Sequence, residues 1–98
     1  MDNQLRRVAL SIRFKEYLLG RDVSSRRILL KTAMSYAEKS NNEKKGEVIE
    51  WLNNVLRINK HLETAEVAYY DVLWDELHTE LIKSTLMYEI MYWFVGQA

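Results

Sequence analysis

Residues 75–80, with the sequence DELHTE, come closest in this chain to a catalytic or metal-binding cluster. On a helix, Asp75 and His78 share a face because residues three apart are neighbours there. A carboxylate and a histidine at this spacing form the ligand pairs of di-iron helix bundles, which need two such pairs and further carboxylates. The second histidine, His61, has an isoleucine three residues before it. We therefore predict that residues 75–80 form an acidic, solvent-exposed face and that the chain binds no metal.

Other residue types that support catalysis are missing or stand in the wrong context. The sequence has no cysteine, which removes thiolate chemistry and disulfides. Its three glycines, at positions 20, 46 and 96, are too far apart to form a phosphate-binding loop. No serine or threonine lies in a recognisable nucleophile motif. We expect a non-catalytic protein with no catalytic residues and no cofactor.

The sequence predicts helices along the whole chain. There is no proline, and apolar residues recur at the helical period without sustained alternation. We expect residues 1–98 to form one all-α domain, an irregular four-helix bundle with helices over about 2–19, 25–38, 47–62 and 65–95. Ser24 is the expected N-cap of the second helix, with Val23 packed on Ile28. Ile28 and Tyr36 are among the apolar positions assigned to that helix, and Thr64 is the expected N-cap of the fourth.

The fourth predicted helix is too long for the domain. At 1.5 Å per residue, residues 65–95 would span about 46 Å, whereas a folded chain of this length is roughly 32 Å across. We therefore expect either a second break near Ser84–Thr85 or a C-terminal end that projects from its own domain.

The stretch from Leu86 to Val95 contains a single charge, at Glu89. It is about half the length that a membrane-spanning helix requires, and the one charge among its aromatic residues, Glu89, is acidic rather than basic, which argues against a membrane surface. We predict that this stretch forms a homodimer interface, because burying large apolar side chains is favourable; its anchors are Tyr88, Met91, Tyr92, Trp93 and Phe94. The alternative is that the chain folds back and these residues form the core of the monomer.

Charge is unevenly placed along the sequence. Residues 1–45 contain 11 Lys and Arg against 5 Asp and Glu, a net charge of +6, and residues 46–98 contain 3 against 9, a net charge of −6. The favoured explanation is that the two halves pair with each other inside one bundle. Basic side chains left at the surface would bind a partner, such as an acidic protein; the predicted set is Arg6, Arg13, Arg26, Arg27 and Lys31.

Together these features favour a non-catalytic protein-interaction module: an adaptor, regulator or inhibitor that binds and masks another protein. By analogy at the level of fold alone, small immunity proteins, antitoxins and phage-encoded inhibitors have such roles. The alternative is a small helical regulator that binds nucleic acid through its basic half, with strongly salt-dependent affinity. The first twenty residues have charges throughout and do not read as a secretory signal, so we expect a cytoplasmic protein.

Overall fold

The computed structural model describes residues 3–59 and 67–97, which contain helices and no β-strand. The predicted all-α class is confirmed. A π-helical turn, η1 (Leu77–Leu81), follows the fourth of five α-helices, so the last predicted helix is divided. In chain order, the α-helices are α1 (Asn3–Leu19), α2 (Val23–Glu38), α3 (Lys45–Asn59), α4 (Val67–Glu76) and α5 (Thr85–Gly96).

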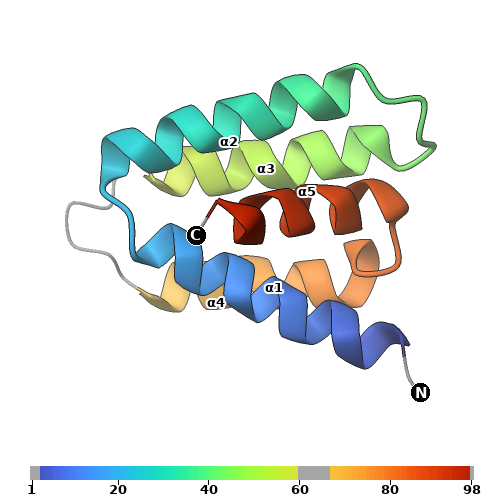
Figure 1. Cartoon of the computed structure of the whole chain (residues 1–98), viewed down its shortest axis with the longest axis horizontal. Helices are drawn as coiled ribbons and strands as arrows, with labels where there is room; N and C mark the ends of the chain where they lie inside the picture. Colours follow the sequence, from blue (N-terminus) through green and yellow to red (C-terminus); the bar gives the residue numbers. More distant parts are fainter. Residues whose placement is uncertain (1–2, 60–66, 98) are drawn as a thin grey trace.

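Helix α5 packs among the other helices and does not project from them (Figure 1). It runs between α1 on one side and the α2–α3 pair on the other, while α4 lies beside α1 and α3. The molecule measures 37 × 29 × 24 Å, too short for an unbroken helix over residues 65–95. Of the two alternatives, a break near Ser84–Thr85 is the one found. The turn expected before residue 65, with its Thr64 cap, lies outside the described residues.

The break before α5 is produced by Ser84. Its backbone is extended, with φ −72° and ψ 129°, and its Oγ accepts a hydrogen bond from the Met87 amide at 3.2 Å. A serine in this position satisfies one of the amides that a helix start leaves without a partner. The chain can therefore reverse here and bring α5 back onto α1.

We expect Ser84→Ala to lower the free energy of unfolding by about 1 kcal/mol, the usual loss when a serine cap is removed. In a domain of this size that corresponds to a fall in Tm of about 4–8 °C, measurable by circular dichroism. Ser24→Ala is the matched control, because Ser24 is an exposed serine in the first turn of α2, and its loss should change stability by less than about 0.5 kcal/mol. Equal losses in the two variants would contradict the capping role of Ser84.

Helix α2 is capped by Asp22 and not by Ser24 as predicted. Oδ1 of Asp22 accepts a hydrogen bond from the Ser25 amide at 2.7 Å. This bond holds the pKa of Asp22 below its usual range. A carboxylate is favoured at this position because its charge opposes the positive end of the helix dipole. The helix therefore starts two residues earlier than predicted, and both Val23 and Ile28 are left exposed.

The core is centred on Phe14 of α1, which is fully buried. Its ring lies 4.6 Å from that of Phe94, 5.2 Å from that of Trp74 and 6.1 Å from that of Trp51, measured between centroids. The two tryptophans have internal hydrogen-bond partners, since Trp51 Nε1 donates to Leu73 O and Trp74 Nε1 to Ser11 O, each at 2.8 Å. This aromatic cluster joins α1, α3, α4 and α5.

The π-helical turn η1 continues α4 with a wider ring. The Ile82 amide bonds to Leu77 O at 2.9 Å, five residues back instead of four. His78, within the turn, lies against α1, where its Nε2 is hydrogen-bonded to Ser11 Oγ at 2.7 Å. The π-helix is rare and occurs mostly as a single turn within an α-helix. Here the turn buries Leu77 and Leu81 while it directs His78 toward α1.

Candidate functional site

An apolar groove of about 390 Å³ lies between α2 and α5. We call it the aromatic groove; its lining residues are Thr32, Ala33, Tyr36, Tyr88, Glu89, Ile90, Tyr92 and Trp93. Ala33 and Ile90 form a buried floor. The rings around them stay at the surface: Tyr92 is 65% exposed, Tyr36 50%, Tyr88 38% and Trp93 36%. Four large aromatic side chains are thus exposed around an apolar floor.

Contacts within the structure hold these rings in place. Tyr36 OH donates a 2.7 Å hydrogen bond to Glu89 Oε2, which ties α2 to α5. The rings of Tyr88 and Tyr92 stack one helical turn apart, with centroids separated by 6.2 Å. The guanidinium of Arg7 lies 5.1 Å from the centroid of Tyr88 and donates to Ile82 O at 3.0 Å. Contacts within the chain are therefore sufficient to form the groove.

The hydrogen bond to Glu89 raises the pKa of Tyr36, and partial burial and the negative charge of Glu89 act in the same direction. We expect Glu89→Gln to bring this pKa back toward 10, the ordinary value. A ¹³C-NMR titration that follows the Tyr36 ring carbon bonded to oxygen would measure the change. Glu80→Gln, on the other side of the fold, is the control and should leave the Tyr36 titration unaltered.

The sign of the linkage follows from the raised pKa of Tyr36. The stability that the Tyr36–Glu89 hydrogen bond contributes is fully present below the ordinary pKa of tyrosine. It is lost as the pH rises through the raised pKa of Tyr36. If the Tyr36 titration were the same in wild type and Glu89→Gln, the bond would not be formed in solution.

The five residues predicted for a dimer interface are split by the fold. Met91 and Phe94 are fully buried in the monomer core, so these two are corrected from interface anchors to core residues. The reason is their spacing, because they lie on the side of α5 that packs on Phe14. Tyr88, Tyr92 and Trp93 lie on the opposite side and remain accessible.

Tyr36, one of the apolar positions predicted for the second helix, is half-exposed and lines the aromatic groove. Its position three residues after Ala33 and one before Ala37 puts it at the edge of the buried face of α2. The apolar period does not distinguish an edge position from a central one. The hydroxyl group, able to bind Glu89, is the only sign of this role in the sequence.

Arg26 must be removed from the basic residues predicted to bind a partner, because it is only 6% exposed. Its Nε donates to Arg21 O at 2.8 Å, and its guanidinium nitrogens reach Leu19 O and Asn59 Oδ1, both at 3.4 Å. The guanidinium therefore joins the end of α1 to the end of α3. The other members of the predicted set are exposed: Arg6, Arg13, Arg27 and Lys31.

Ion pairs between the two oppositely charged halves are few in the described part of the chain. Within residues 3–59 and 67–97, one ion pair connects them, between Lys15 Nζ and Asp71 Oδ1 at 3.1 Å. Of the predicted charge pairing between the two halves, the described residues show this one ion pair. Much of the acidic half faces a separate groove.

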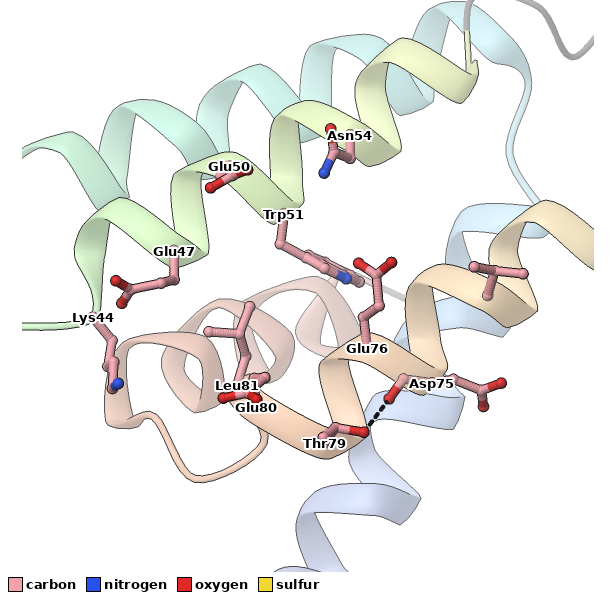
Figure 2. Close-up of a pocket in the computed structure, with 11 residues that line it drawn as sticks. Lys44, Glu47, Glu50, Trp51, Asn54, Asp75, Glu76, Thr79, Glu80 and Leu81 are labelled. Carbon is pink, nitrogen blue, oxygen red and sulfur yellow. Dashed lines mark hydrogen bonds between the residues drawn. The ribbon is translucent and has the colours of Figure 1, made fainter.

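This acidic groove, of about 690 Å³, lies between α3 and the α4–η1 segment. Figure 2 shows Glu47 and Glu50 projecting from α3, and Glu76 extending toward Trp51 from the other wall. Asp75 points away from the space in this view. The complete lining is Lys44, Glu47, Glu50, Trp51, Asn54, Val72, Asp75, Glu76, Thr79, Glu80 and Leu81.

The spacing of Asp75 and His78 does not assemble a ligand set in the structure. His78 is turned away from the acidic groove and bonds to Ser11 on α1. Throughout the described part of the chain, no three His, Asp or Glu side chains are placed to share a metal ion. The carboxylates of the groove are spread along its two walls, an arrangement that gives a negative surface.

Similarity to other proteins adds no further information about this site. No protein-family model matches the sequence, and neither a curated protein nor a solved structure is detectably similar to it. Among the helices of the described residues, none combines the length and the apolar character needed to cross a membrane.

Proposed function

We propose that this protein is a non-catalytic protein-interaction module that uses the aromatic groove to bind another polypeptide. The observation that carries the proposal is the ring of four exposed aromatic side chains around an apolar floor. Tyrosine and tryptophan contribute a large apolar area with few rotatable bonds, and they are enriched among the residues that dominate binding energy between proteins.

The pre-formed geometry of the groove supports the same proposal. The Tyr36–Glu89 bond and the Tyr88–Tyr92 stack fix the rings in the free protein. Little binding free energy is therefore lost to ordering these side chains when a partner binds. Exposed cations on α1 and α2, such as Arg13 and Lys31, would speed the approach of an acidic partner without forming the main contact.

The nucleic-acid alternative has less support. Binding through phosphates requires several cations on one accessible surface. Arg26, a member of the predicted basic set, is buried and bonded within the protein. Arg7 is engaged by two backbone carbonyls and by Tyr88.

The proposal is tested by photo-crosslinking in the cells from which the protein comes. A benzophenone amino acid replaces Tyr92 in the groove or, as the control, Ile12, an exposed residue of α1. We expect ultraviolet light to produce a discrete protein adduct from position 92 and none from position 12. Adducts that contain only lipid or nucleic acid, or equal adducts from both positions, would contradict a protein-docking role for the groove.

A further inference from the structure

Apart from Glu89, the exposed residues of α5 are uncharged. At helical spacing, Thr85, Tyr88, Tyr92 and Gly96 follow one another on the side turned away from the core. The one charged residue of α5, Glu89, is bonded to Tyr36 OH. A surface that covers this stripe must itself be apolar and free of unpaired charge, since burying an unpaired charge is costly.

Gly96 is the last residue of α5, and its backbone and surroundings in the monomer do not require a glycine. A Cβ atom added there would meet nothing within 4 Å, and the residue does not have a positive φ. Such a glycine, with open space in front of it, is typical of a position that another backbone approaches closely.

We propose that the partner on the aromatic groove is a second copy of this chain, with the two α5 helices packed antiparallel about a two-fold axis. This inference rests on the proposed function, in which the groove is a docking surface. The axis passes near the middle of α5. Tyr88 of each copy then faces Tyr92 of the other, and the small residues Thr85 and Gly96 come together at both ends, where they let the helices approach.

The available area and charge are compatible with such a pair. The exposed parts of the four aromatic residues equal about two whole side chains, or roughly 400 Å² per copy. Ile28, one helical turn before Thr32 on α2, is 66% exposed and adds to the same side. A standard interface buries about 800 Å² per partner, so this dimer belongs to the weak class. The formal net charge of zero removes overall repulsion between copies.

Sedimentation velocity of the purified full chain, from about 5 µM to 1 mM, tests the dimer in the range expected of a weak interface. We expect the wild type to shift from monomer to dimer with concentration. Tyr92→Ser and Gly96→Leu should each raise the dissociation constant at least tenfold and leave the circular dichroism spectrum unchanged, because both positions are open in the monomer. Tyr69→Ser, at a half-exposed tyrosine of α4, is the control and should dimerise normally.

The antiparallel geometry has a separate test, because the protein has no cysteine of its own. Thr85→Cys and Gly96→Cys are prepared as single variants. Under mild oxidation, an equimolar mixture should form disulfide-linked dimers much faster than either variant alone, since position 85 of one copy faces position 96 of the other. Equal rates in the mixture and in the separate samples would overturn this pairing.

A wild type that remains monomeric at 1 mM overturns the inference, as does a dimer that neither Tyr92→Ser nor Gly96→Leu weakens. A dimer weakened by Tyr92→Ser alone overturns the α5–α5 pairing. These results are distinguishable from failure of the proposed function. If position 92 crosslinks to a different protein while the purified chain stays monomeric, the proposed function holds, because the groove is a docking surface. The dimer inference fails in that case, because the partner is not a second copy of this chain.

Discussion

Phe14→Ala is expected to remove about 3–5 kcal/mol from the free energy of unfolding, the range for deleting a buried aromatic side chain. Proteins of this kind have about 5–15 kcal/mol in total, so much of the stability would be lost. The corresponding fall in Tm is about 15–30 °C for a domain of this size. Urea denaturation followed by tryptophan fluorescence would measure the loss directly.

The size of this effect follows from the number of elements that meet at Phe14. Its ring contacts Trp51 of α3, Trp74 of α4 and Phe94 of α5. Deleting it leaves a cavity among large rigid rings, which cannot collapse to fill the space. Ile12→Ala is the control on the same helix, because Ile12 is 41% exposed and should cost less than about 1 kcal/mol. A Phe14→Ala protein about as stable as Ile12→Ala would contradict the central position of Phe14 in the core.

Two adjacent arginines are expected to respond very differently to substitution. Arg26→Ala should destabilise the fold by about 2–3 kcal/mol, because it removes hydrogen bonds from a charged donor and leaves the buried Asn59 Oδ1 and two partly buried carbonyl groups without that donor. Arg27→Ala, at an exposed position one residue further on, should change stability by less than about 0.5 kcal/mol. Thermal and urea unfolding of the two variants, measured at the same protein concentration, provide the comparison.

The reason for the difference lies in where the guanidinium of Arg26 goes. It bonds to Arg21 O and reaches Leu19 O and Asn59 Oδ1, so it holds the α1–α2 connection against the end of α3. It also lies close to Tyr70, whose pKa is raised by burial and lowered in part by the charge of Arg26. If Arg26→Ala and Arg27→Ala were equally mild, Arg26 would be a surface residue in solution, as its charge predicts.

Arg26 also illustrates what the sequence could have revealed. Positions 26, 30, 33 and 37 follow the helical period, and Leu30, Ala33 and Ala37 are all buried with Arg26. The charge of Arg26 predicts an exposed position, whereas its spacing predicts a buried one. A similar conflict occurs in α5, where the whole apolar stretch was assigned to an interface. The period separates Met91 and Phe94, which are buried, from Tyr88 and Tyr92.

Features with a local chemical signal were predictable, and features that depend on long-range contacts were not. The break at Ser84 could be expected because a serine before an apolar run caps a helix and because one long helix would not fit. The π-helical turn has no such signal, since nothing in residues 77–81 differs from an ordinary helical sequence. The orientation of His78 toward Ser11 depends on that turn and was therefore missed. The aromatic groove depends on α5 lying beside α2, which no local pattern reports.

The π-helical turn has a consequence for how related chains would align. The Ile82 amide reaches Leu77 O across one residue more than an α-helix requires. If an exposed residue such as Thr79 were deleted, the same two groups would be four residues apart and could keep their bond in ordinary α geometry. The chain after Ile82 would keep its helical register, and the hydrogen bond from Thr79 Oγ1 to Asp75 O would be lost with the deleted residue. A homologue one residue shorter would therefore carry its gap within residues 77–81, with α5 and its exposed stripe aligned without a shift.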